Sequence, residues 1–135
     1  MPYFEDLTEY IYTKNSGTGL VNVGWLDSVH PFNRGEVDQE IVLRIADLCR
    51  NPVNRMRGFH RCEMCKECPV REPVGENGQV VTLGDAEIHI QGRHTVYVCP
   101  TLIYHYIVRH KYRPPEEFVD AVRLTGNGSQ RRSRA

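Results

Sequence analysis

The sequence has no long apolar segment. No apolar run approaches the roughly eighteen residues that a membrane-spanning helix requires, so we predict no membrane partner. The stretch Met1–Asp6 has neither a basic start nor an apolar core, and we therefore expect no signal peptide. These two absences favour a cytoplasmic location.

The sequence also lacks an excess of charge of either sign. Seventeen basic side chains balance seventeen acidic ones, and the formal net charge is zero. A dedicated polyanion binder usually carries a clear basic excess, so the composition argues against that class. We expect one domain over residues 1–124 and a disordered, arginine-containing tail over residues 125–135.

Several catalytic motifs are missing. The chain contains no HExxH pair, no phosphate-binding glycine loop and no nucleophile elbow, and its cysteines do not follow the deaminase pattern. The cysteine count is five, an odd number, and three of the five are clustered. Such clustering is more typical of metal binding in a reducing compartment than of a disulfide framework.

One short stretch is rich in possible metal ligands. His60, Cys62, Cys65 and Cys68 lie within nine residues, and a two-residue gap between cysteines lets one turn direct both sulfurs at one ion. A structural zinc site needs four such ligands. We predict zinc held by Cys49, His60, Cys62 and Cys65, because Cys49 lies in the last turn of a predicted helix whose exit loop leads to the cluster.

Other uses of these cysteines remain open. Cys68 is an alternative ligand, since the spacing from Cys62 to Cys65 is repeated between Cys65 and Cys68. Three evenly spaced thiolates also suit an iron–sulfur cluster, although the run lacks the fourth cysteine of the ferredoxin pattern and leaves His60 without a role. A redox dithiol lacks the strand–helix–strand context of thioredoxin-like motifs.

Two further sets of residues are candidates for function. Basic residues around the cysteine cluster suggest contacts to nucleic-acid phosphates, namely Arg55, Arg57, Arg61 and Lys66. A set of acid–base groups suggests a catalytic cleft, namely Glu87, His89, His94 and His105. For each set, an ordinary solvated surface is the simpler interpretation.

The pattern of apolar residues predicts an α+β fold with antiparallel hairpins and three helices. Strands are expected at 9–14, 20–26, 79–83, 86–90 and 94–98, and helices at 36–50, 101–112 and 116–124. The first two strands should pair as a hairpin, and residues 91–93 should form a turn. Residues 70–78 are expected to be a polar connection.

Five short motifs occur in order along the chain: Gly24-Trp25-Leu26, Arg57-Gly58-x-His60-x-Cys62-x-x-Cys65, Leu83-Gly84-x-Ala86-Glu87-Ile88, Tyr97-x-x-Pro100-x-Leu102-Ile103-x-His105-Tyr106-Ile107 and Tyr112-x-Pro114-Pro115-x-Glu117-Phe118. As a set, they resemble a family of small uncharacterised bacterial proteins over residues 3–124. The resemblance implies a cytoplasmic single-domain protein with a metal-binding knuckle on His60, Cys62 and Cys65. It implies no activity.

Three functions are compatible with the sequence. The first is a zinc-stabilised module that binds another protein, as regulators and toxin-neutralising proteins do. The second is a nucleic-acid-binding module that uses the basic residues of the knuckle, and the third is a metal-dependent hydrolase. The neutral composition favours the first.

Overall fold

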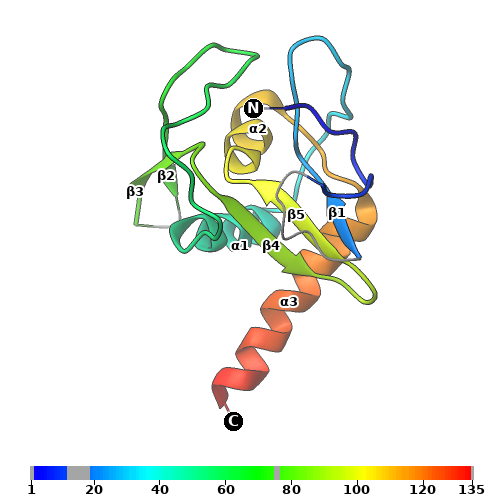
Figure 1. The fold of residues 1–135 in the computed structure, drawn as a ribbon. Helices are drawn as coiled ribbons and strands as arrows, with labels where there is room; N and C mark the ends of the chain where they lie inside the picture. Colours follow the sequence, from blue (N-terminus) through cyan, green and yellow to red (C-terminus); the bar gives the residue numbers. More distant parts are fainter. Residues whose placement is uncertain (1, 12–18, 75–76, 135) are drawn as a thin grey trace.

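The computed structural model describes residues 2–11, 19–74 and 77–134, with only the backbone for 126–134. Within these ranges the chain forms three helices and two small sheets (Figure 1), which confirms the predicted α+β class with antiparallel hairpins. The elements are β1 (Leu20–Asn22), α1 (Gln39–Arg50), β2 (Val70–Val74), β3 (Gln79–Leu83), β4 (Glu87–Gln91), β5 (Val96–Pro100), α2 (Ile103–His110) and α3 (Glu116–Arg134).

The larger sheet has the strand order β1-β5-β4. Strands β4 and β5 are antiparallel, and the predicted turn at residues 91–93 joins them. Strand β1 runs parallel to β5, with Leu20 opposite Val96. Of the predicted first hairpin, the described residues show one isolated bridge between Glu9 and Val21, and residues 12–14 lie outside the described ranges.

The smaller sheet is the antiparallel hairpin of β2 and β3. The prediction of a polar connection is therefore wrong for Val70–Val74. Val70, Glu72 and Val74 point inward in this strand, whereas the residues between them are exposed. The alternation of apolar and polar residues that predicts a strand is interrupted by Glu72 at the central inward position. An acidic side chain is rarely buried without a partner, so the sequence did not predict a strand here.

Helix α1 contacts α2, α3, both strands of the small hairpin and β4. Its apolar residues recur at helical spacing, so that Ile41, Ile45 and Cys49 are buried on one face. The helix ends where the Asn51 N–H bonds to the carbonyl of Leu48, one residue before a proline that cannot continue the helix. Helix α1 thereby holds both sheets and the other helices around one core.

The N-terminal segment covers the second face of the larger sheet. Tyr10, Trp25 and Val98 form a buried cluster there, separate from the main core. The Trp25 indole N–H donates to the carbonyl of Val98 at 2.9 Å. Strand β5 is consequently buried on both of its faces.

The last two helices differ in extent from the prediction. Helix α2 ends at His110, because Lys111 adopts the left-handed conformation with φ 61°. The backbone of α3 continues past Leu124 to Arg134. The division into a domain over 1–124 and a disordered tail stays a prediction. None of the helices in the described ranges is long and apolar enough to cross a membrane.

Candidate metal centre

Four possible metal ligands from two distant segments converge beside helix α2. Cys62 and Cys65 lie in the loop before β2, and His105 and His110 belong to α2. Their ligand atoms all lie within 4.8 Å of one another. The contacting pairs are 48 and 40 residues apart in the chain, so the group exists only in the folded protein.

The distances in this group suit one tetrahedral ion. Cys62 Sγ lies 3.3 Å from His110 Nε2, and Cys65 Sγ lies 3.4 Å from His105 Nε2. A tetrahedral zinc ion with ordinary zinc–sulfur and zinc–nitrogen bonds would hold sulfur and nitrogen about 3.5 Å apart. The group can therefore hold a metal ion with little rearrangement.

The loop around the two cysteines is a tight turn. The N–H of Lys66 bonds to the carbonyl of Cys62 at 2.7 Å, and the N–H of Cys62 bonds to the carbonyl of Glu67 at 3.0 Å. Burial raises the pKa of the Cys62 thiol, while hydrogen bonds from the backbone N–H groups of Cys65 and Met64 lower it in part. Those N–H groups point at the sulfur and would stabilise a thiolate bound to a cation.

His105 is fixed by a buried carboxylate on the neighbouring hairpin. Its Nδ1 lies 2.7 Å from Glu72 Oε2, and both side chains are almost completely buried. Arg109 binds the same carboxylate with two of its nitrogens, at 2.7 and 3.0 Å. Although burial alone would raise it, the bonds from Arg109 and His105 hold the pKa of Glu72 below its usual value. The ionised Glu72 accepts a hydrogen bond from the Nδ1–H of His105, which leaves the Nε2 lone pair of His105 directed at Cys65.

His110 is the last residue of α2 and approaches Cys62 from the helix end. The His105 and His110 rings lie 5.0 Å apart between centroids. Burial and the nearby His105 lower the pKa of His110, so the neutral form that binds metals is favoured. Two histidines that are five residues apart do not lie on the same face of a helix, as two that are four residues apart do. His105 and His110 nevertheless both reach the group, because the cysteine turn lies beside the end of α2.

The structure brings together only part of the predicted ligand set. Cys62 and Cys65 are in the group, whereas Cys49, His60 and Cys68 lie outside it. Cys49 faces the core from the last turn of α1, where its thiol lies 3.7 Å from the carbonyl of Thr101 and burial raises its pKa to about 12. His60 is tied through its backbone N–H to the carbonyl of Gly84, and Cys68 is exposed.

Sequence reasoning placed His105 in a cleft and missed His110 as a ligand. The one signal that could have found them is a pair of histidines on an amphipathic helix downstream of a Cys-x-x-Cys turn. Their five-residue spacing obscured that signal, because the usual helical zinc pair is four apart. Glu72, which orients His105, lay in the stretch predicted as a connection.

The predicted cleft residues do not converge on one site. Glu87 is buried and lies 3.3 Å from His89, and it also accepts hydrogen bonds from Tyr10 and Asn54. His105 belongs to the metal group, and His94 lines a separate groove between the β4–β5 turn and α3. Glu87 is therefore held in a hydrogen-bond network within the described part of the fold.

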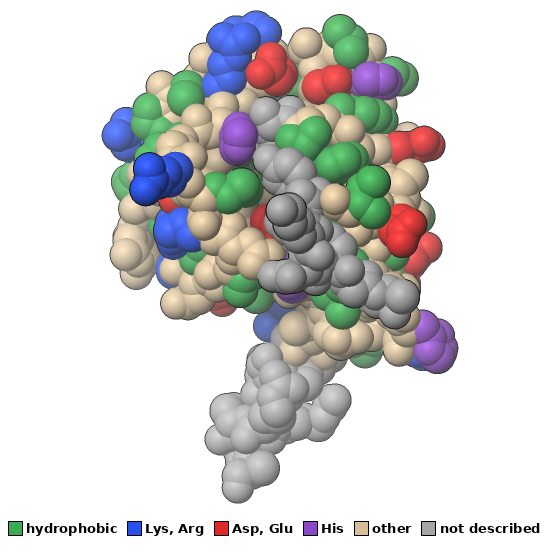
Figure 2. All heavy atoms as spheres, viewed as in Figure 1, with side chains coloured by type: hydrophobic (Ala, Val, Ile, Leu, Met, Phe, Trp, Pro, Cys, Tyr) green, Lys and Arg blue, Asp and Glu red, His purple; other side chains and the backbone are tan. Residues whose placement is uncertain are grey.

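The predicted nucleic-acid contacts lie on an irregular surface loop, and three of the four have acidic partners. Arg55 pairs with Asp85 at 2.7 Å, and Arg61 and Lys66 both pair with Glu63. On the face that Figure 2 shows, the visible basic side chains lie mainly on the side of this loop and the small hairpin. These pairs weaken the positive potential that a phosphate backbone would meet.

One protein family matches residues 2–123, and its description is a domain of unknown function, DUF7919. The chain belongs to the DUF7919 family. This membership agrees with the resemblance to an uncharacterised family. No curated protein and no solved structure matches the chain.

Proposed function

We propose that this DUF7919 domain is a zinc-stapled module that acts by binding another protein. The observation that carries the proposal is the closed set of four protein ligands, Cys62, Cys65, His105 and His110. Structural zinc sites have four protein ligands, whereas catalytic zinc sites keep one position open for water or substrate. A closed set favours a structural role over hydrolysis.

The donor chemistry favours zinc over an iron–sulfur cluster. Two thiolates and two imidazoles on a single ion are a common structural zinc set. Cubane clusters are held by four thiolates. The remaining cysteines do not supply them, since Cys49 and Cys99 are buried away from the group and Cys68 lies outside it. When bound, the ion would supply coordination bonds that hold the loop before β2 against α2.

All five cysteines are free thiols, which is consistent with a reducing compartment. We therefore place the protein in the cytoplasm as part of the proposal. A regulator or a toxin-neutralising protein is the type of module that suits a small domain with a closed structural metal site. The surface around the metal centre would serve as the binding face.

The test is metal analysis of the full chain purified anaerobically. We expect one equivalent of zinc, no stoichiometric iron and a colourless protein. Cys65→Ser and His110→Ala should each lose most of the metal. Cys68→Ser and His60→Ala serve as matched controls from the same loop and should retain it. Stoichiometric iron, or metal loss in the controls with retention in Cys65→Ser and His110→Ala, would contradict the proposed site.

Nucleic-acid binding is the second candidate. The charge of the stretch from residue 50 to 71 favours it, because this stretch contains six basic side chains and only two acidic ones. Phosphate contacts release counterions, so affinity for a single strand or a duplex should fall steeply with salt. We expect binding no tighter than about 10⁻⁴ to 10⁻⁶ M near physiological salt, the range of non-specific contacts. Submicromolar binding lost in an Arg55→Ala, Arg57→Ala, Arg61→Ala variant of unchanged stability would put this function first.

A further inference from the structure

The metal centre is open to solvent on one side, at Cys65. Cys65 is exposed and Cys62 is completely buried, although both sulfurs belong to the group of four ligands. The neighbours of the Cys65 sulfur do not cover it: His105 approaches from α2 at 3.4 Å, and Glu67, at 4.0 Å, is itself exposed. A dissolved reactant can therefore reach one ligand sulfur in the folded protein.

In the metal-bound protein, Cys65 also has the chemical form that reacts with oxidants. A bound cation deprotonates the cysteines that coordinate it. The thiolate is the nucleophilic form of cysteine, and susceptibility to oxidation follows thiolate character and exposure. All five cysteines lie in the described part of the chain, and of these only Cys65 is both exposed and a member of the group.

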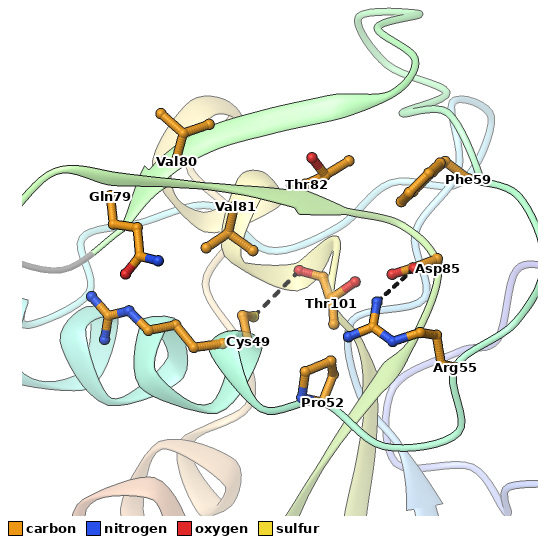
Figure 3. A pocket seen from close by; sticks show the side chains of 11 residues that line it. Cys49, Pro52, Arg55, Phe59, Gln79, Val80, Val81, Thr82, Asp85 and Thr101 are labelled. Atoms are coloured by element: carbon orange, nitrogen blue, oxygen red, sulfur yellow. Dashed lines mark hydrogen bonds and ion pairs between the residues drawn. The ribbon is translucent and has the colours of Figure 1, made fainter.

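The cysteines outside the group should be slower to react. Cys68 is exposed, but no cation holds it as a thiolate, because it is not a member of the group. Cys49 and Cys99 are buried. Figure 3 shows Cys49 at the end of α1, where its thiol points at the carbonyl oxygen of Thr101, 3.7 Å away. Oxidation should therefore begin at Cys65.

A second ligand sulfur lies close to the exposed one. The ligand atoms of the group all lie within 4.8 Å of one another, so the sulfurs of Cys62 and Cys65 are neighbours. The turn between them is closed by the bond from the N–H of Lys66 to the carbonyl of Cys62. Two cysteines separated by two residues are the arrangement of the Cys-x-x-Cys redox motifs. Here the metal ion, rather than a thioredoxin-like fold, would supply the thiolates.

We infer that Cys65 is an oxidation site for hydrogen peroxide and related hydroperoxides, and that its oxidation closes a disulfide with Cys62 and releases the metal ion. The inference rests on the metal centre of the proposed function and adds a regulatory reaction to it.

The reaction has two steps. The Cys65 thiolate attacks one oxygen of hydrogen peroxide, so that an S–O bond forms, the O–O bond breaks, and the departing hydroxide takes a proton from solvent. The Cys62 thiolate then attacks the sulfur of the resulting sulfenic acid. An S–S bond forms, the S–O bond breaks, and the second hydroxide also takes a proton from solvent. The two thiolates have lost two electrons, and the peroxide has been reduced to two water molecules.

The disulfide removes two of the four ligands. His105 and His110 remain, whereas a structural zinc site needs four protein ligands, so the ion should dissociate. The loop before β2 is then no longer linked to α2 through the metal, and the proposed binding face around the centre changes with the redox state. A reducing thiol and fresh zinc should reverse the change.

The experiment uses the full chain, purified anaerobically and loaded with zinc. Hydrogen peroxide is added stepwise, catalase stops the reaction, and a chromogenic chelator too weak to strip the loaded protein reports released zinc. We expect one equivalent of peroxide to release one equivalent of zinc and to remove the mass of two hydrogen atoms from the protein. Dithiothreitol with added zinc should restore the metal content.

Peptide mapping identifies the disulfide. Trypsin cleaves after Arg61, Lys66 and Arg71, so a bond between Cys62 and Cys65 stays within one peptide, whereas any bond from either to Cys68 joins two peptides. We expect the first result. The three other cysteines should be recovered as free, alkylated thiols.

Two variants test the site itself. Cys68→Ser is the matched control, since it removes an exposed thiol of the same loop from outside the group, and it should release zinc at the wild-type rate. Cys65→His replaces the exposed thiolate with an imidazole, which can bind zinc but cannot form a disulfide. It should release zinc at least about tenfold more slowly. If Cys65→His holds no zinc, the peptide map of the wild type decides in its place.

The inference is overturned by a disulfide that includes Cys68, by irreversible oxidation of Cys65 to the sulfinic acid, or by zinc release from Cys65→His as fast as from wild type. Zinc that stays bound in a large excess of peroxide also overturns it, and leaves the zinc site of the proposed function in place. A protein that holds no zinc before peroxide is added contradicts the proposed function itself.

Discussion

Glu72 occupies an unusual position for a carboxylate, since it is buried on the inward face of a short strand. Its burial is compensated by His105 on one oxygen and by the guanidinium of Arg109 on both. A ligand histidine is commonly oriented by a carboxylate on its other ring nitrogen, and such partners tune metal affinity. Glu72 contacts no metal ligand atom, so it acts on the centre through His105.

Replacing Glu72 with Gln should therefore weaken metal binding without changing the four ligands. We expect the dissociation constant for zinc to rise about 10- to 100-fold, the range found for such orienting partners. Competition with a chromogenic chelator measures it. Glu40→Gln, at an exposed position of α1, is the control and should bind zinc as wild type does. Equal affinities for Glu72→Gln and wild type would show that His105 needs no orienting carboxylate.

Glu87 is a second buried carboxylate, and its pKa predicts a pH dependence. Although burial alone would raise it, hydrogen bonds from His89, Tyr10 and Asn54 hold the pKa of Glu87 below its usual value. A carboxyl group with a lowered pKa in the folded state contributes stability that is present above its unfolded pKa, about 4.3, and is lost as the pH falls through the folded value.

We expect Glu87→Gln to reduce the free energy of unfolding by about 2 kcal/mol, as for loss of hydrogen bonds to a charged group. The reduction should be constant between about pH 5 and 8, where the group is ionised in both states, and should shrink below about pH 4. Denaturant titrations across this range measure it, with exposed Glu9→Gln as a control. A difference that shrinks as the pH rises from 5 to 8 would indicate a raised pKa instead.

At the scale of elements, the loop before β2 is held at its midpoint as well as at the metal centre. The N–H of His60 bonds to the carbonyl of Gly84 at 3.0 Å, just after β3. Gly84 has φ +109°, and a Cβ there would lie 2.7 Å from the carbonyl oxygen of His60. Only glycine allows the two backbones to approach this closely.

Gly84→Ala should destabilise the protein by about 3 kcal/mol, because it combines an unfavourable φ with a backbone clash. Gly78→Ala is a matched control, since Gly78 also has a positive φ of 71° but faces open space. It should cost only about 1 kcal/mol, the strain of the left-handed conformation. Equal losses measured by chemical denaturation would show that the contact with His60 has no effect on stability.

For the whole molecule, the metal centre links a long irregular loop to a core that has its own apolar packing. Buried apolar residues of α1, α2 and β5, among them Ile45, Ile103 and Cys99, lie in one cluster that includes Cys62. The centre should therefore add stability to a fold whose helices and strands do not depend on it alone. Ligand-linked stability grows with the logarithm of free ligand concentration.

Chelation should lower the melting temperature reversibly. Above the dissociation constant, each tenfold rise in buffered free zinc should increase the free energy of unfolding by about 1.4 kcal/mol. Denaturation in zinc buffers measures this slope, and Mg²⁺ at the same concentrations should have no effect because hard cations prefer oxygen ligands. In Cys65→Ser the slope should be absent. If the free energy of unfolding of the wild-type protein did not change with free zinc, the metal centre would not stabilise the fold.

The sequence alone determined the features that depend on neighbouring residues. The periodicity of apolar residues located α1, the Gln91-Gly92-Arg93 turn located the β4–β5 hairpin, and the two-residue gap identified Cys62 and Cys65 as a pair. Each of these signals reflects local geometry, in which spacing along the chain translates directly into direction in space.

Only the tertiary structure decided which distant groups meet. Nothing in the spacing of His110 indicates that it faces Cys62, and nothing around Glu72 indicates that its partners lie on α2. The strand at Val70–Val74 was hidden because its central inward residue is an acid, which folding can bury only beside His105 and Arg109. Such pairings depend on how elements pack after they form, and packing is set by the whole chain rather than by any stretch of it.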